Sequence, residues 1–491
     1  MTVSFKYLPA STIRIPGVFA EFDASRANTG LPAQRGLILG QVLTGSTMPT
    51  GAPLICQGVA DTQARAGNGS MLALMVEQWR KSDPFGELWM LPLADDGAAV
   101  AATGTVLVTH VATANGTYVL YIAGQRVLTL VTSAMTTTQI ATALAAAVNA
   151  IPSLPVTASS NTATVTLTAK NLGAAGNDIQ LTENFLGPAG GEVMPAAMTT
   201  TVTAMASGAT NPTLTNPLLA LTTLTFDFIA VPYNDTTTNT AINGLLSDST
   251  GRWAWNNELF GCAFNAYRGT FGSLVTFGLS QNGNHLATMG FNGSMSPYWL
   301  WAADVAAAVA VSARANPTQP ITEIPLNVWA PPIASRFLMS DRDTLLHDGI
   351  STFRTEADGT PYIERMITNY QLNASGAPDN SWLDVETNYT AMAAIRDMRT
   401  FLRTNFARKV LVSDATRISD QSTVVTAQTI RSAVTSRYRF QETLGWVQNS
   451  ATFAASLVVE NAGNGQVRIM APYDFGNQLR QIAMLVDFVK S

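Results

Sequence analysis

One long block of this sequence carries almost no charge. Between residues 100 and 220 the charged side chains are only five: Arg126, Lys170, Asp178, Glu183 and Glu192. Threonine, valine and alanine dominate the block, and Thr and Val favour the pleated surface of a β-sheet. Strands are expected at 106–108, 118–122, 127–131 and 162–168, with an alanine-rich helix at 138–150. The block is therefore predicted to be an inserted Thr/Ala-rich α+β domain, residues 100–220.

The segments before and after the block share one pattern of alternating strands and helices. Short apolar strands are expected at 36–39, 87–93, 226–231, 261–267 and 286–291. Helix-like stretches lie between them, and the one at 298–315 is apolar on nearly every side, as in a buried helix. Strands that alternate with helices indicate a mostly parallel sheet. Residues 26–99 and 221–368 are therefore predicted to form one discontinuous α/β domain.

The rest of the chain divides into a C-terminal α+β region and two terminal arms. In residues 369–480, helices are expected at 386–408 and 425–442 and strands at 453–459 and 467–470. Residues 1–25 and 481–491 alternate apolar with polar side chains, which is the strand pattern. Pro9 and Pro16 confine the N-terminal strands to sheet edges. The alternating apolar residues are Val3, Phe5, Ile13, Ile15, Ile482, Met484, Val486 and Phe488.

Composition excludes several classes of protein. Charged residues make up 12% of the 491, about half the usual quarter, whereas disordered chains are rich in charge. The net charge of -5 disfavours a nucleic-acid binder. Two cysteines, Cys56 and Cys262, exclude a disulfide framework and a cysteine-rich metal site. The longest apolar stretch, about 14 residues at 298–311, is too short to cross a bilayer. We expect a soluble, unsecreted protein with no membrane insertion.

No motif for catalysis, a cofactor or a metal stands out, so the sequence predicts no enzyme. Phosphate-binding glycine loops and the Gly-x-Ser-x-Gly elbow are missing. His285 could meet Ser294 and an aspartate, and His347 adjoins Asp348 in a segment that also holds Asp341 and Asp343. A Ser-His-Asp site is recognised by geometry rather than by sequence. Structural histidines are the default interpretation.

A row of arginines marks the expected helix at 386–408. Arg396, Arg399 and Arg403 lie beside an apolar face made by Ile395, Met398, Leu402 and Phe406. The row fits a solvated helix edge, and it equally fits a docking surface for an acidic partner. The residues alone do not separate these alternatives.

Four stretches outside the low-charge block form a joint pattern. The first is Ile13-Arg14-Ile15-Pro16-Gly17, followed by Glu21-Phe22-Asp23-x-Ser25-Arg26-Ala27. The second is Arg342-x-x-x-Leu346-x-Asp348-Gly349-Ile350. The third is Ile363-Glu364-Arg365-x-Ile367-Thr368-x-Tyr370-Gln371-x-Asn373-Ala374, continuing to Asp379-x-Ser381-Trp382-Leu383-Asp384-Val385. The fourth is Pro472-x-Asp474-x-x-Asn477-Gln478. In these residues the chain resembles the tail sheath proteins of Mu-type contractile-tailed bacteriophages, although Trp382 stands where the family has tyrosine.

The resemblance implies a subtilisin-like α/β domain without protease chemistry and a structural role. Sheath subunits of this family stack as six-fold helical rings around a tail tube and lend terminal strands to neighbours. They contract to drive the tube through the host envelope for genome delivery. The two arms would then be the exchange strands, with hinges near 17–30 and 474–480.

The partners that the resemblance implies are further copies of this chain, the tail tube protein, and baseplate and tail terminator or neck proteins. Direct contact with nucleic acid is not expected. The resemblance implies that the protein is located in the virion tail and is assembled in the host cytoplasm. The row Arg396, Arg399 and Arg403, on the inner C-terminal domain, is predicted to face an acidic tube. The alternatives are the sheath of a phage-derived bacteriocin or other contractile injection system, and a cytosolic subtilisin-like hydrolase.

Overall fold

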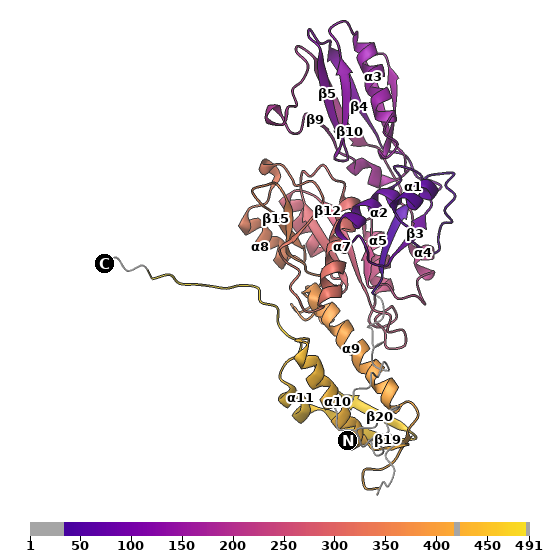
Figure 1. Cartoon of the computed structure of the whole chain (residues 1–491), viewed down its shortest axis with the longest axis vertical. Helices are drawn as coiled ribbons and strands as arrows, with labels where there is room; N and C mark the ends of the chain where they lie inside the picture. The colour runs from indigo at the N-terminus through magenta and orange to yellow at the C-terminus, as the bar shows by residue number, and fades with distance from the viewer. Residues whose placement is uncertain (1–33, 417–422, 488–491) are drawn as a thin grey trace, which may run out of the picture.

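The computed structural model describes residues 34–416 and 423–487, which form three bodies along the long axis of the molecule (Figure 1). The low-charge block lies at one end, the parallel sheet in the middle, and a group of C-terminal helices at the other end. Each body has its own large cluster of buried apolar side chains. We refer to them as the insert, the central body and the C-terminal body.

The central body is built on a six-stranded sheet in the order β13-β12-β11-β1-β3-β2. All neighbours pair in parallel except the short edge strand β2, which is antiparallel to β3. The bounds are β1 (Gly36–Gln41), β2 (Leu54–Ile55), β3 (Leu88–Leu93), β11 (Phe228–Ala230), β12 (Cys262–Arg268) and β13 (Leu286–Phe291). Strand β1 precedes the insert and pairs with β11, which follows it. The predicted mostly parallel sheet is confirmed. Its subtilisin-like character and the domain boundaries stay predictions.

Helix α7 (Tyr298–Ala315) is the buried helix that the sequence predicts, with the same bounds. Its many alanines let it pack closely against the sheet and against α2 (Met71–Ser82). Asp304 is buried in it and accepts hydrogen bonds from Ser82 Oγ at 2.6 Å and Asn327 N at 2.5 Å. Burial raises the pKa of Asp304 to about 6.

Shorter elements complete the central body. The helices are α1 (Val59–Ala66), α4 (Thr215–Leu219), α5 (Thr236–Leu245), α6 (Phe271–Leu279) and α8 (Met339–His347), with a 3₁₀ turn at Ile333–Ser335. A small antiparallel sheet has the order β14-β16-β15, made of β14 (Ile324–Pro325), β15 (Thr352–Thr355) and β16 (Pro361–Arg365).

The insert holds two antiparallel sheets and one long helix, whereas α4, at the end of the low-charge block, packs in the central body through Leu218. One sheet has the order β10-β4-β8-β7 and the other β6-β5-β9. The bounds are β4 (Thr103–His110), β5 (Gly116–Ile122), β6 (Gln125–Val131), β7 (Val156–Asn161), β8 (Thr164–Ala169), β9 (Leu181–Glu183), β10 (Thr199–Ala206) and α3 (Thr137–Asn149), with 3₁₀ turns at Ala174–Asp178 and Pro188–Gly190. Thr136 and Gln139 form a capping box at the start of α3. Ile140, Leu144 and Val148 of this helix are buried in the insert's own cluster.

The ion pair of Asp178 with Arg268 ties the insert to the central body. Asp178 Oδ1 lies 2.5 Å from Arg268 Nε, and Asp178 Oδ2 accepts a hydrogen bond from Tyr298 N at 2.7 Å. Arg268 also donates to the carbonyls of Ser294 and Ser296. Burial raises the pKa of Asp178, and Arg268 opposes that shift. Lys170 Nζ likewise donates to Asn68 O of the central body at 3.1 Å, so two of the insert's five charges lie at its junction.

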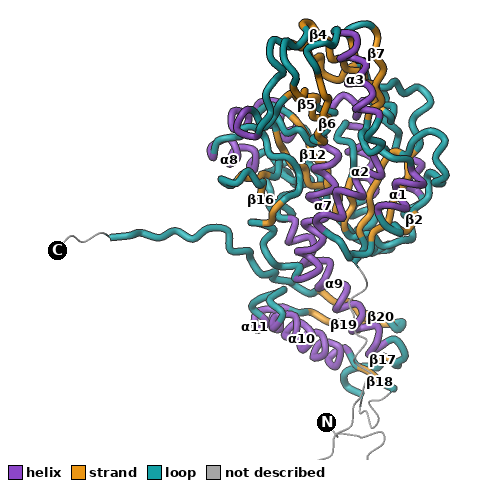
Figure 2. The backbone as a smooth tube through the Cα atoms, turned by 45° about the horizontal axis from the view of Figure 1, so that its top comes forward, coloured by secondary structure: helices purple, strands orange, loops and turns teal. Residues whose placement is uncertain are grey.

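The C-terminal body is joined to the rest by the long helix α9 (Val385–Phe406) (Figures 1 and 2). It also contains β17 (Val410–Leu411), β18 (Val424–Val425), α10 (Ala427–Thr443), α11 (Ser450–Ser456), β19 (Val458–Gly463) and β20 (Gln466–Met470). The predicted strand at 453–459 is wrong at its start. Ala454 and Ala455 favour a helix, and Phe453 stacks on Tyr438 at 3.7 Å, so α11 precedes a strand that begins only at Val458.

The Asp178→Asn substitution should destabilise the fold, because it leaves Arg268 partly buried without its counter-ion. We expect a loss of about 2–4 kcal/mol in the free energy of unfolding, measured by chemical denaturation. Asp61→Asn is the matched control, since the Asp61–Arg65 pair lies at 3.3 Å on the surface of α1 and such pairs contribute less than about 1 kcal/mol. Equal effects of the two substitutions would contradict this role for Asp178.

Candidate functional site

The C-terminal segment leaves the molecule as an extended tail. Residues 481–487 form no helix or strand and run away from all three bodies (Figures 1 and 2). Ile482, Met484 and Val486 are 79%, 80% and 69% exposed. The strand predicted here is therefore not formed within one chain, because a strand needs a hydrogen-bonding partner and this chain supplies none in the described residues. Phe488 and the N-terminal candidates Val3, Phe5, Ile13 and Ile15 lie outside the described residues.

The start of this tail is fastened to the C-terminal body at Asp474. Its carboxylate accepts hydrogen bonds from Asn449 Nδ2 at 2.7 Å and Gln448 Nε2 at 3.0 Å. These bonds lower the pKa of Asp474. Phe475 then makes an antiparallel bridge with Val447.

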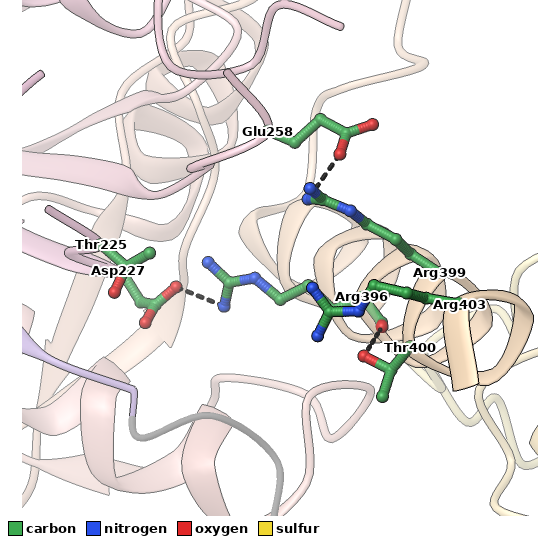
Figure 3. Close-up of a pocket in the computed structure, with 7 residues that line it drawn as sticks. All are labelled: Thr225, Asp227, Glu258, Arg396, Arg399, Thr400 and Arg403. Atoms are coloured by element: carbon green, nitrogen blue, oxygen red, sulfur yellow. Dashed lines mark hydrogen bonds and ion pairs between the residues drawn. The ribbon is translucent and has the colours of Figure 1, made fainter. Parts of the chain in front are cut away.

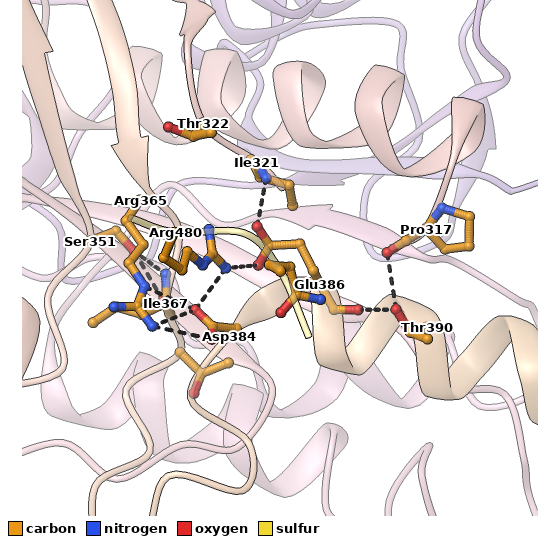
Figure 4. A network of polar contacts seen from close by, with 12 residues as sticks. Pro317, Ile321, Thr322, Ser351, Arg365, Ile367, Asp384, Glu386, Thr390 and Arg480 are labelled. Carbon is orange, nitrogen blue, oxygen red and sulfur yellow. Dashed lines mark hydrogen bonds and ion pairs between the residues drawn. The ribbon is translucent and has the colours of Figure 1, made fainter. Parts of the chain in front are cut away.

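A second fastening lies five residues farther on, at the first turn of α9 (Figure 4). Arg480 Nη2 lies 2.9 Å from Asp384 Oδ1 and 3.0 Å from Glu386 Oε2. Asp384 also accepts a hydrogen bond from Arg365 Nε at 3.0 Å. Glu386 accepts one from Ile321 N at 2.5 Å. The cluster therefore joins the tail, α9 and the central body in one set of contacts.

Glu386 is the buried member of this cluster. Its side chain has no exposed surface, and burial raises its pKa while the charge of Arg480 lowers it. A buried carboxylate is tolerated only where cations or hydrogen-bond donors face it. Arg480 and the Ile321 amide supply both.

The hairpin of β19 and β20 has unpaired edges. The two strands pair only with each other among the described residues. Val459 and Val467 pack onto the C-terminal core, whereas Val458 and Met470 are 47% and 62% exposed. An isolated two-stranded sheet is marginally stable, and free edges accept further strands. This hairpin is the candidate acceptor for an added strand.

The predicted arginine row lies on α9, facing the central body (Figure 3). Arg396 Nη1 lies 2.6 Å from the buried Asp227 Oδ1, and Arg399 Nη1 lies 2.5 Å from Glu258 Oε2. With Thr225, Thr400 and the exposed Arg403 they line a cavity of about 200 Å³. Two of the three arginines thus find their acidic partners inside this chain. No carboxylate of the described residues pairs with Arg403.

The row's apolar face is divided between two cores. Met398, Leu402 and Phe406 pack in the C-terminal body, whereas Ile395 packs against the central body. The helix thus buries one side along its whole length, and the arginines occupy the edge between the bodies.

The candidate catalytic residues do not converge. His285 Nε2 bonds Asp248 at 2.9 Å and its ring stacks on Trp253 at 3.9 Å. Ser294 Oγ instead donates to Trp329 O and accepts from Trp301 Nε1. His347 is exposed, and its Nδ1 lies 2.8 Å from Asp343 O.

The described residues form neither a metal cluster nor a membrane-spanning helix. In residues 34–416 and 423–487 no cluster of His, Cys, Asp or Glu is arranged to hold a metal. Asp341 caps α8 by accepting from Leu338 N at 3.0 Å. None of the described helices combines the length and apolar character needed to cross a bilayer.

Sequence reasoning missed Arg480 and Glu386. A signal for Arg480 exists, since it is the only Lys or Arg between residues 469 and 489. Asp384 belongs to one of the four stretches that carry the resemblance, and Arg365 to the same stretch. Their contact with each other and with Arg480 depends on tertiary structure.

Two comparisons with known proteins both indicate tail sheath proteins. Residues 207–369 match the family model described as the phage tail sheath protein central domain. The chain is 32% identical over 493 residues to the Mu-like prophage FluMu tail sheath protein of Haemophilus influenzae, covering 100% of both chains.

Solved structures of low sequence identity are also similar. The sheath tail protein of Listeria innocua has 13% identity and a TM-score of 0.47, covering 91% of this chain and 97% of that one. The sheath complex of an extracellular contractile injection system in the contracted state has 9% identity and a TM-score of 0.44, covering 97% and 98%.

The Arg480→Met substitution should destabilise the protein in a pH-dependent way. Without Arg480 the pKa of Glu386 rises further, so the folded state binds a proton that the unfolded state releases above pH of about 4.3. Stability is then lost as pH rises. We expect a loss of about 3 kcal/mol at pH 8 and less at pH 5, measured by urea unfolding.

The matched control is Arg468→Met, because Arg468 lies 3.9 Å from Glu460 in an exposed pair. It should show no such dependence on pH. An equal loss at both pH values in Arg480→Met would show that the buried charge of Glu386 is not the cause.

Proposed function

This chain belongs to the phage tail sheath family, and from that premise we propose that it is the subunit of a contractile sheath built as six-fold helical rings around a tail tube. The single observation that carries this proposal is full-length similarity to a tail sheath protein. That family is structural rather than enzymatic, in line with the separate surroundings of His285 and Ser294. The phage tail and a related contractile injection particle remain the two settings for such a subunit.

We propose that neighbouring subunits are joined by strand addition. The tail at 481–487 carries the exposed Ile482, Met484 and Val486 with no partner strand among the described residues, and in the same part of the chain the β19–β20 hairpin has free edges with exposed Val458 and Met470. Backbone hydrogen bonds along the edge would supply affinity, and alternate side chains would set the register. A head-to-tail contact of this kind need not close on itself, so it generates a helical polymer.

Contraction in this proposal is a rigid-body rotation of subunits that buries more surface between them. The extended sheath would be a kinetically trapped state, held by the tube and the baseplate. The energy comes from contacts between subunits, so no nucleotide is needed. The sequence places the C-terminal hinge at 474–480, and Asp474 and Arg480 fasten both ends of that segment. We therefore place the bending beyond Arg480.

The remaining partners are the tube, the baseplate and the tail terminator. We propose that the C-terminal body faces the tube. Since Asp227 and Glu258 already neutralise Arg396 and Arg399, a contact between the arginine row and an acidic tube depends on Arg403.

Removing either arm should abolish polymers and leave a folded monomer. The variants are deletions of residues 1–16 or 481–491, examined by negative-stain microscopy and sedimentation, with circular dichroism as the test of folding. A finer variant replaces Ile482, Met484 and Val486 by asparagine, with Gln481 and Ala483 replaced by asparagine as its control. Polymers that survive both deletions would disprove strand exchange.

Reversing the charge of Arg403 should weaken assembly on tubes. Arg403→Glu should slow co-assembly with purified tube protein, because it places a negative charge against an acidic surface, and added salt should reduce the difference. Arg65→Glu, on α1 of the central body, is the control. Unchanged assembly of Arg403→Glu on tubes would remove the arginine row from the tube contact.

A further inference from the structure

We propose that Arg480 is a clamp that fixes where the C-terminal arm begins, and so limits how far apart two joined subunits can lie. The clamp is the contact of Arg480 with Asp384 and Glu386 (Figure 4). This inference rests on the proposed strand addition and adds a positioning residue to it.

The clamp changes which body the arm departs from. The chain leaves the C-terminal body at Gly476, which follows the bridged Phe475 and donates its N–H to Trp446 O at 3.2 Å. Four residues later, Arg480 returns the chain to the first turn of α9, beside Ile321 and Arg365 of the central body. The free arm therefore starts from the junction of the two bodies, and its origin moves with that junction.

The contacts fit a permanent anchor rather than a passing one. Arg480 and Asp384 have only 22% and 19% of their side chains exposed, and Glu386 has none. Two arginines, Arg365 and Arg480, face two carboxylates, so the cluster is balanced in charge. Releasing Arg480 would leave Glu386 buried without a cation, which is strongly unfavourable.

The clamp also sets the length of the arm. The arm residues 481–491 span at most about 40 Å when fully extended. If the chain were free from residue 477, the four additional residues would lengthen that reach by about 14 Å. Several arm residues must pair along the receiving strand edge. That edge must therefore lie within the shorter reach, measured from Arg480. A short tether of this kind holds neighbours close in every state of the polymer.

The test is one insertion placed at two positions. Five residues, Gly-Ser-Gly-Ser-Gly, are inserted either after the exposed Asn477, before the clamp, or after Gln481, beyond it. The axial repeat of the polymers is then measured from micrographs. The insertion after Asn477 should form a loop between the two anchors and leave the repeat unchanged. The insertion after Gln481 should lengthen the tether and shift the repeat by up to about 17 Å, or make the polymers irregular.

The same pair of insertions in the Arg480→Gln background provides the second test. With the clamp open, both positions should lengthen the arm, so their polymers should become alike. If that variant does not fold, the insertions in the unaltered chain still decide. Identical repeats for the two insertions in the unaltered chain would overturn the clamp.

The deletion of residues 481–491 separates the two proposals. Loss of polymers on deletion, together with identical repeats for the two insertions, would leave strand addition standing and refute the clamp. Polymers that persist after this deletion would refute strand addition by the C-terminal arm.

Discussion

The burial of Glu386 is the constraint on which the joint between the bodies depends. A carboxylate without exposed surface is costly unless charges and donors face it, and here they come from two directions. Ile321 of the central body donates a backbone hydrogen bond, and Arg480 supplies the cation from the far end of the chain. Because Glu386 lies in the first turn of α9, fixing its surroundings also fixes the direction in which that helix enters the C-terminal body.

Charges are scarce in this chain, and several of them lie where bodies meet. Asp178 and Arg268 link the insert to the central body, and Arg396 with Asp227 links α9 to the parallel sheet. In the insert, threonine-rich strands leave hydroxyl groups on the surface, so solubility does not require charge. Ion pairs such as Arg35–Glu87 and Arg437–Asp397 also lie within single bodies, so joining bodies is one of two uses of charge in this chain.

Much of the fold could be predicted because its elements carry local signals. The bounds of β13 and α7 follow from their apolar runs, and the alternation of strands and helices on both sides of the insert predicts a mostly parallel sheet. That β1 pairs with β11 in this sheet is known only from the structure. The start of α11 could not be predicted in this way, since Phe453 fits either a strand or a helix. Its ring is committed to Tyr438, a contact between residues fifteen positions apart.

The candidate site shows the same division. The alternation of Ile482, Met484 and Val486 is visible in the sequence, and a period of two is typical of a strand. These side chains are exposed because no partner strand is present among the described residues. The arginine row was equally visible as a pattern. Its partners Asp227 and Glu258 were not, since they lie more than a hundred residues away.

The sequence by itself thus determined most of the elements, the alternating pattern of the C-terminal tail and the kinship with sheath proteins, because these depend on local periodicity and on linear motifs. Only the tertiary structure decided which charges are neutralised inside the chain and where the C-terminal arm departs. Those outcomes depend on contacts such as Arg480 with Glu386, whose strength comes from burial, and burial is a property of the packed chain rather than of any segment of it.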